Sequence, residues 1–413
     1  MNRLSWPALA LFSAALAPAS GADTLSLDEA IRYALSHQPD VATARAQAQS
    51  ASGQLRVAAS GYLPTVSVSA STGRIQDQPS GYQAAATTVS ARQLLFDLGR
   101  TPYSVAAARA SLRAARAGDL DTRILVARSV TAAYFVLLEA NGIARANADA
   151  VKSREAERDA AAAKLEAGTA PRFDLLRAET ALAQSRQDLS AAQGDIRRAQ
   201  SGLNNAIGRS SDAPVEAVDP ADVQDVALPD AIQRALAARP DVEAARQNLE
   251  AARKSLSATR LGNAPTVSAS GDLGATRSAF PATDLKWSVG VSVSFTAFDG
   301  LRINGEVQTA RAGVAQAEAA LRRAELTAGR EVTDAITAVQ VAAEQVNLGE
   351  ATVRQASEAR DVAVGRYQAG AGTQLEVTDA ESQLLLAQVS LINSRYALAA
   401  NRRALLYIMG NTP

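Results

Sequence analysis

The stretch LDEAIRYALSHQPDV at residues 27–41 returns as LPDAIQRALAARPDV at residues 228–242, an offset of 201 residues. LPTVSVSAS (63–71) matches APTVSASGD (264–272) at the same offset. Three further matches lie 202 residues apart: the Phe-Asp pairs of LLFDLGR and TAFDGLR, then KLEAGTAPRFDLLRAET with RYQAGAGTQLEVTDAES, and Gly208 with Gly410. A near-constant offset over so much of the chain indicates that a unit of about 200 residues occurs twice.

The N-terminus has the pattern of a secretory signal peptide. Arg3 precedes an apolar run at residues 9–16, and small residues lead to an expected cleavage after Ala22. The apolar run is too short for a transmembrane helix, and a buried N-terminal helix is the alternative. The predicted organisation is a signal peptide (1–22), a first repeat (23–208), a linker (209–226), a second repeat (227–410) and a short tail (411–413).

Each repeat is predicted to contain the same elements in the same order: a short helix, a second helix, a β-hairpin, a very long helix and a return helix. The short helices are expected at 26–36 and 227–238, and the second helices at 40–60 and 241–261. The expected strands are 63–75, 84–96, 265–276 and 285–298. Runs without proline at 103–167 and 301–369 predict the long helices, followed by return helices at 171–207 and 374–408.

The strands alternate between apolar and polar residues. One face of the last strand carries Leu285, Trp287, Val289, Val291, Val293 and Phe295, and the other face is polar or small. Such alternation over about ten residues is typical of a tilted membrane-spanning strand, although a half-buried sheet in a soluble domain is the alternative. Four strands cannot close a barrel, so several chains must share one: two chains provide eight strands and three provide twelve.

The predicted helices are long and thin. The chain has 93 alanines and only 4% aromatic residues, so a thick core is not expected. Apolar residues in the first return helix recur every seven positions, which predicts a coiled-coil seam that needs neighbouring helices. This stripe consists of Leu175, Leu182, Leu189, Ile196 and Leu203.

Composition argues against several functional classes. The 42 basic and 42 acidic residues leave no positive excess for nucleic acid. The absence of Cys and the single His37 leave no thiolate nucleophile and almost no basis for a histidine metal site or a catalytic relay. We therefore expect no enzymatic activity, no cofactor and no metal site.

The signal peptide, the duplicated helix–hairpin–helix unit, the Phe-Asp strand exit and the segment RYQAGAGTQLEVTDAE (366–381) together resemble the TolC family of outer-membrane efflux proteins. The resemblance covers nearly the whole chain after residue 22. It implies a mainly α fold with a membrane β-barrel contribution: a homotrimer with a shared 12-stranded barrel in outer-membrane lipid and a 12-helix periplasmic α-barrel. It also implies a passive exit duct for a tripartite efflux or type I secretion system, joined through a periplasmic adaptor to an inner-membrane pump or ABC transporter.

By the same resemblance, Asp174, Glu376 and Asp379 correspond to acidic residues at the family's periplasmic aperture, and Tyr367 to an aperture tyrosine. In a trimer each acid recurs three times around one axis, which repels like charges and attracts cations. An acid in the first turn of a helix also complements the helix dipole, and this reading stays open. Gly372 stands where the best-known member has an arginine, so the lock between helices is expected to be weaker or differently built.

The expected hairpin tips match the family's adaptor-contact triplets. They consist of Ala167, Gly168 and Thr169 in the first repeat and Ala369, Gly370 and Ala371 in the second. Glycine at these positions also suits a plain helix C-cap, which remains the alternative.

Two other classes of exported protein share part of this pattern. A periplasmic adaptor is also rich in helical hairpins, but it has one hairpin between β-rich halves rather than two tandem units. A soluble structural coiled coil does not explain the alternating strands. The identity of the exported substrate is not encoded in any motif, and we expect the pump to select it.

Overall fold

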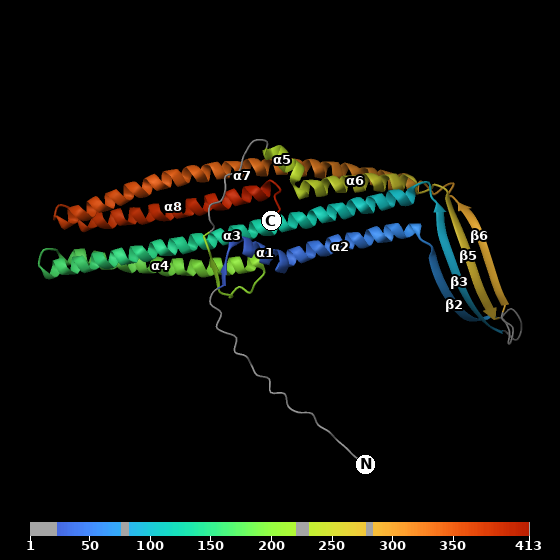
Figure 1. Ribbon diagram of the computed structural model, residues 1–413, viewed down its shortest axis with the longest axis horizontal. Coiled ribbons are helices and arrows are strands. Elements are labelled where there is room, and N and C mark those ends of the chain that lie inside the picture. The colour runs from blue at the N-terminus through green and yellow to red at the C-terminus, as the bar shows by residue number, and fades with distance from the viewer. Residues whose placement is uncertain (1–22, 76–81, 220–230, 278–283, 413) are drawn as a thin grey trace, which may run out of the picture.

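The computed structural model describes residues 23–75, 82–219, 231–277 and 284–412. The predicted signal peptide, residues 1–22, lies outside this part, as do residues 227–230 at the predicted start of the second repeat. The molecule is elongated, with a β-sheet at one end and two helical hairpin tips at the other (Figure 1).

Four long helices make up most of this length. α3 (Arg100–Glu166) and α7 (Arg302–Gln368) have 67 residues each, and α4 (Arg172–Ile207) and α8 (Gln374–Ile408) return beside them. At about 1.5 Å per residue, α3 and α7 are each about 100 Å long. Alanine has the highest helix propensity, and the one proline of α3, Pro102, sits in the first turn, where its missing N–H costs nothing.

Four shorter helices lie at the middle of the molecule and between the middle and the sheet (Figure 1). They are α1 (Leu27–His37), α2 (Pro39–Ala59), α5 (Ala231–Ala238) and α6 (Pro240–Arg260), with a single 3-10 turn η1 (Ser60–Tyr62) after α2. A reciprocal capping box between Ser26 and Glu29 starts α1. Pro39 and Pro240 begin α2 and α6, as expected for proline at the first helical position.

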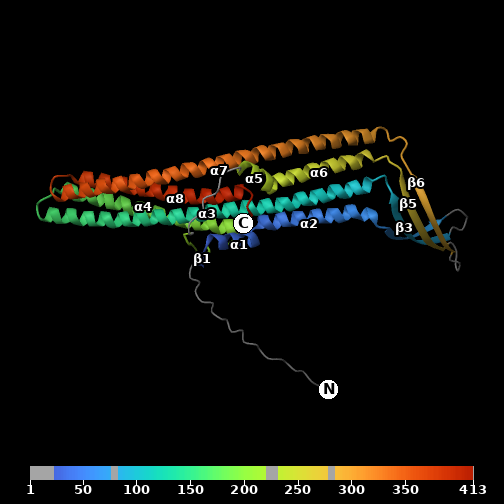
Figure 2. The same cartoon turned by 45° about the horizontal axis from the view of Figure 1, so that its top comes forward.

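Within each repeat, the second helix and the return helix stack end to end beside the long helices. α2 continues the line of α4, and α6 continues that of α8 (Figures 1 and 2). Gly208 ends α4 at φ +78°, and a Cβ there would lie 3.2 Å from the carbonyl oxygen of His37. At Gly410, φ is +89° and a Cβ would lie 2.9 Å from the carbonyl carbon of Ala238. The duplicated glycines therefore allow these close junctions.

The sheet has four antiparallel strands in the order β2–β3–β5–β6, so β3 and β5 join the two repeats. Their bounds are β2 (Thr65–Ile75), β3 (Tyr82–Phe96), β5 (Thr266–Arg277) and β6 (Asp284–Ser294). β2 and β6 are edge strands without a second partner among the described residues. The alternating apolar side chains of β6, including Trp287, are exposed in the single chain.

β6 ends earlier than the strand predicted at 285–298. Its last residue, Ser294, pairs with Thr266, the first residue of β5. Pro265 precedes Thr266 and has no N–H to donate, so the ladder with β5 stops there. Phe295 and Phe298 belong instead to an exposed connection that leads to α7.

The aspartates of the duplicated Phe-Asp pairs lie just before the long helices and cap their first turns. Asp97 accepts hydrogen bonds from Gly99 N (3.1 Å) and from Thr101 N (2.7 Å) and Oγ1 (2.6 Å). Asp299 accepts from Ile303 N (2.9 Å) and from the Asn263 side chain (2.8 Å). Each aspartate thus accepts hydrogen bonds from backbone N–H groups that would otherwise lack a partner at the start of the helix.

The main hydrophobic core lies midway along the molecule, where α1, α3 and α4 meet. Its largest fully buried side chains include Tyr134, Leu137, Leu203 and Ile207. Beside it, β1 (Asp23–Leu25) pairs in parallel with β4 (Val215–Ala217), inside the segment predicted as a linker. Tyr134 fastens this pair, because its Oη accepts from Val218 N at 2.9 Å and lies 2.8 Å from Leu25 O.

The two long helices differ in burial. α3 packs against α1, α2, α4, α6 and α8, whereas α7 packs against α5, α6 and α8 and buries few side chains. Among the described residues, α3 is also the one helix long and apolar enough to span a membrane by length and composition. More than half of that apolar window is buried inside the protein, as in an ordinary core helix.

Candidate functional site

The two hairpin tips share one backbone conformation. Gly168 and Gly370 adopt φ +72° and +74°, the left-handed region that glycine favours. Thr169 N donates to Lys164 O, and Ala371 N donates to Arg366 O, both at 2.9 Å. These are six-to-one bonds that close a helix end. The predicted adaptor-contact residues form the turns, and all six are exposed: Ala167, Gly168, Thr169, Ala369, Gly370 and Ala371.

The predicted gate acids lie just beyond these turns. Asp174 is in the first turn of α4, and Glu376 is in the first turn of α8, where its N–H donates to the Thr373 side chain at 3.3 Å. Asp379 lies one turn further along α8 and is exposed. No hydrogen bond or ion pair of the Asp379 side chain occurs within the described part of the chain. Asp174 and Glu376 therefore lie where an acid complements the helix dipole, and their role in a gate stays a prediction.

Tyr367 links the two hairpins. Lys164 from the end of α3 places Nζ 3.6 Å from the centroid of the Tyr367 ring and donates to Tyr367 O at 3.1 Å. The phenol oxygen is buried and has no hydrogen-bond partner in the described residues. Burial, with the negative charges of Asp174 and Glu157, raises the pKa of Tyr367. The ring thus contacts a cation of α3, and the charge of an acid of α4 acts on its hydroxyl.

Gly372 is explained by local crowding. A Cβ at this position would lie 3.0 Å from Arg366 Cβ and 3.1 Å from Tyr367 N. Arg366 itself reaches back across the turn, with Nη2 3.2 Å from Ala371 O and 3.8 Å from Glu376 Oε2. A cation is therefore present at this tip, but it comes from the end of α7 and pairs within its own hairpin.

A buried charged cluster joins the hairpins further from the tips. Arg154 of α3 is 7% exposed and donates from Nη1 to Glu157 Oε2 and from Nη2 to Thr378 O and Ser382 Oγ, each at 3.0 Å. Its Nε lies 3.6 Å from Glu381 Oε2, and Ser153 Oγ donates to Glu381 Oε1 at 2.6 Å. One guanidinium thus contacts two carboxyl groups across the junction between α3 and α8.

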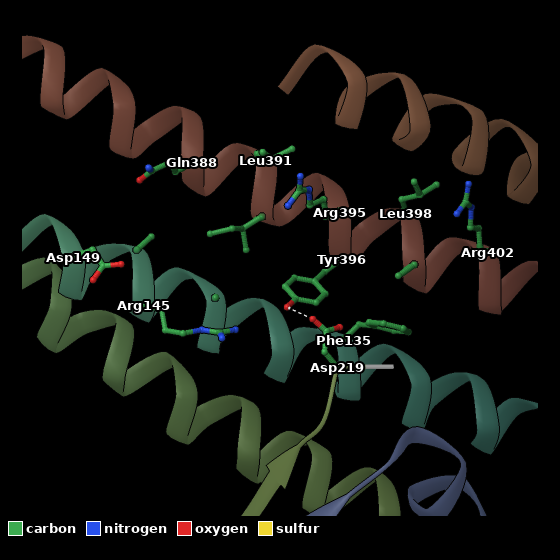
Figure 3. A pocket seen from close by; sticks show the side chains of 14 residues that line it. Phe135, Arg145, Asp149, Asp219, Gln388, Leu391, Arg395, Tyr396, Leu398 and Arg402 are labelled. Carbon is green, nitrogen blue, oxygen red and sulfur yellow. Dashed lines mark hydrogen bonds between the residues drawn. The ribbon is translucent and has the colours of Figure 1, made fainter. Parts of the chain in front are cut away.

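A groove between α3 and α8 lies nearer the middle of the molecule (Figure 3). Tyr396 donates to Asp219 at 3.2 Å inside it, and burial followed by the Asp219 charge raises the pKa of this phenol. Arg395 pairs with Glu350 at 2.8 Å. These charges are satisfied by protein groups, so the groove serves as a junction between the repeats rather than as a prepared ligand site.

Several residues at the tips and in the buried cluster behind them were missed by sequence reasoning. Lys164, Arg366, Arg154, Glu157 and Glu381 belong to long charged helices in which nothing marks one position above another. One signal was available, since Lys164 is one of four lysines among 42 basic residues. No cluster of three or more potential metal ligands occurs in the part of the chain that the structure describes.

Comparison with known proteins supplies the family context for this geometry. The model of the outer membrane efflux protein family matches residues 30–209 and again residues 231–411. Protein CyaE of Bordetella pertussis is 29% identical over 409 residues, covering 94% of this chain and 84% of that protein. Nodulation protein T of Rhizobium leguminosarum bv. viciae is 25% identical over 387 residues, covering 91% and 80%.

The fold matches solved structures over nearly its full length. The outer membrane protein VceC of Vibrio cholerae superposes with a TM-score of 0.83 at 24% identity, covering 94% of this chain and 96% of that one. The two proteins therefore share one fold over nearly their whole length.

Proposed function

The chain belongs to the outer membrane efflux protein family, and on this basis we propose how it forms and closes an exit duct. It is an outer-membrane efflux channel with a large periplasmic helical part. The family assignment applies to each repeat separately, because the family model matches both. We retain residues 23–208 and 227–410 as the repeats and residues 1–22 as the signal peptide.

The observation that carries the proposed assembly is the open four-stranded sheet. Its edges, β2 and β6, leave backbone N–H and C=O groups that lipid cannot satisfy. Three copies would pair each β6 with the β2 of a neighbour and close a barrel of twelve strands. The exposed apolar residues of β6 would then face lipid, with the polar residues toward the lumen.

The helices support the same threefold assembly. α7 carries exposed leucines and valines on a helix that packs on few elements of its own chain, and α4 adds exposed apolar residues near its tip. The members of this set are Leu326, Val341, Leu348, Val362, Phe173 and Leu176. Each chain contributes four helical positions around a tunnel: α3, α7, the α2–α4 stack and the α6–α8 stack. Three chains would form a wall of twelve helices that buries these side chains.

At the periplasmic end we assign the gate to Asp174, Tyr367, Glu376 and Asp379. Threefold repetition would place rings of carboxylates at the narrow end of the tunnel, where they repel one another and favour cations. The contact of Lys164 with the Tyr367 ring supports a closed arrangement in which the two tips of one chain hold together.

The exposed turns at Ala167–Thr169 and Ala369–Ala371 are assigned to adaptor contact. Small residues on a tight turn permit close approach by a helical partner. The partners proposed are a periplasmic adaptor protein and an inner-membrane pump or ABC transporter, which supplies the energy. The duct itself would perform no catalysis and hold no cofactor.

Membrane flotation of the expressed protein tests the assembly. We expect the protein to float with outer-membrane lipid, to migrate as a detergent-stable trimer and to form pores in planar bilayers. Recovery in the soluble periplasm would contradict the channel. Glu376→Ala combined with Asp379→Ala should raise resting conductance, and an unchanged conductance would remove these two residues from the gate.

A further inference from the structure

Resting on the proposed channel function, we infer that Arg154, Glu157 and Glu381 form a proton-dependent clamp that holds the α3–α4 hairpin against the α7–α8 hairpin of the same chain. Arg154 is proposed as a positioning residue, and Glu157 as the group that exchanges the proton. The clamp lies behind the gate: Glu157 is nine residues before the end of α3, which corresponds to about 14 Å along the helix.

The contacts of Arg154 explain why the clamp spans both hairpins. Its guanidinium bonds to Glu157 on its own helix and to Thr378 O and Ser382 Oγ on α8. The side chains of Arg154, Glu157 and Glu381 are only 8%, 12% and 10% exposed. Separating the hairpins would break these bonds to α8, so the cluster favours contact between the hairpins.

The charge balance of the cluster requires a proton. One guanidinium cannot neutralise two buried carboxylates. Two carboxylates that share one buried site repel each other, which disfavours ionisation of both. Burial, the hydrogen bond with Glu381 and the Glu381 charge raise the pKa of Glu157 to about 8, despite the opposing effect of Arg154. Glu157 Oε1 is also buried without a donor directed at it. A proton held between the two carboxyl groups removes both the excess charge and the unsatisfied oxygen.

Among the described residues, Arg154 and Glu381 are the charged groups that act on Glu157, and the other charges nearby have partners of their own. On α3, Arg158 pairs with its neighbour Asp159 at 2.7 Å. From α4, Arg186 pairs with Glu155 at 2.7 Å. From α7, Tyr367 contributes a neutral phenol, and the nearby Lys164 makes a cation–π contact with its ring. On α8, Glu381 is the partner itself, and Ser382 is neutral.

The direction of the pH effect follows from the raised pKa. In separated hairpins Glu157 is solvated and its pKa returns toward the ordinary value of 4.5. Opening therefore releases a proton between about pH 4.5 and 8, so acid favours the clamped state and higher pH favours opening. One proton changes the ratio of the two states by at most about tenfold per pH unit, and the effect levels off above pH 8.

The test measures resting conductance of the full-length channel in planar bilayers from pH 5.5 to 8.5. Glu157→Gln keeps the shape and can still donate to Glu381, so its conductance is expected to stay low and independent of pH. Arg154→Gln removes the cation and should raise conductance throughout this range. Glu155→Gln, two residues away in an exposed ion pair within the α3–α4 hairpin, is the matched control and should retain the wild-type profile.

A second readout separates failure of the clamp from failure of the channel. Because the chain has no cysteine, spin labels at Lys152→Cys on α3 and Gln383→Cys on α8 report the distance between the hairpins without conduction. We expect this distance to lengthen with rising pH in the otherwise wild-type chain and to be fixed in Glu157→Gln. A distance and conductance unaffected by pH, or the same response in both chains, would overturn the clamp. Absence of pores with an intact distance response would instead contradict only the channel.

Discussion

At the scale of single residues, the contact between the two hairpins depends on a few long side chains that bond to residues of another helix. Lys164 reaches the ring and carbonyl of Tyr367, and Arg154 reaches the backbone of α8. Neither contact has a counterpart in composition or periodicity, because both arise from the register between helices of different repeats. Asp97 and Asp299 are different, because the sequence repeat marks their positions. Their role in capping the long helices could not be predicted from it.

Lys164→Met should loosen the closed tip. It removes the cation–π contact with Tyr367 and the hydrogen bond to its carbonyl, a loss of about 1 kcal/mol or roughly fivefold in the open-to-closed ratio. Passive uptake of a large antibiotic by cells that express the variant measures the effect. Lys152→Met is the control, because Lys152 is exposed and pairs with Asp149, an exposed residue of its own helix. Equal uptake in both variants would exclude Lys164 from closure.

Asp97→Ala should destabilise the start of α3 by about 1 kcal/mol, as expected for loss of a helix cap. Although burial raises the pKa of Asp97, hydrogen bonds from Thr101 and Gly99 outweigh it, and the pKa is lowered. Its stabilising contribution is therefore present above about pH 4 and lost as the pH falls below 3.8 through the folded-state pKa. Thermal unfolding at pH 7 and pH 3 measures this: the gap between wild type and variant should narrow in acid. A constant gap would contradict the capping role.

At the scale of elements, the alternation of apolar and polar residues predicted the strands closely. Where a strand ends is decided by the neighbouring strand with which it pairs. The last strand was expected to reach residue 298, but Pro265 at the start of its neighbour ends the ladder at Ser294. The helices were predictable from alanine content and proline-free runs. The pairing of β1 with β4 was not, because strands of three residues carry no periodic signal and this pair joins positions nearly 200 residues apart.

Val291→Arg should impair membrane insertion. Val291 belongs to the exposed apolar face of β6, and an arginine facing lipid near the bilayer centre costs about 2–4 kcal/mol. Ser292→Arg places the same charge on the opposite face and is the matched control, expected to insert normally. Flotation and trimer yield compare the two. Similar yields from both would show that β6 does not face lipid.

At the scale of the whole molecule, the two repeats are one folding unit rather than two domains. α3 of the first repeat packs against α6 and α8 of the second, and β3 pairs with β5. The duplication was plain from the sequence, but this interleaving was not, because an internal repeat says nothing about whether its copies fold separately.

A chain divided after residue 226 should therefore reassemble from two co-expressed halves, each exported by its own signal peptide. Either half alone should fail to accumulate in the membrane, since half of the α3 surroundings would be missing. Co-purification through a tag on one half measures reassembly. Stable insertion of the first half by itself would contradict interdependence of the repeats.

The parallel pairing of β1 with β4 also has a consequence for biogenesis. Residues 23–25 dock against residues 215–217, which leave the secretion machinery only after the whole first repeat has crossed. Closing a loop of this length is slow compared with forming local helices. The first segment to arrive is thus among the last to find its place, and the export pathway must keep it unpaired and free of wrong partners until translocation is half complete.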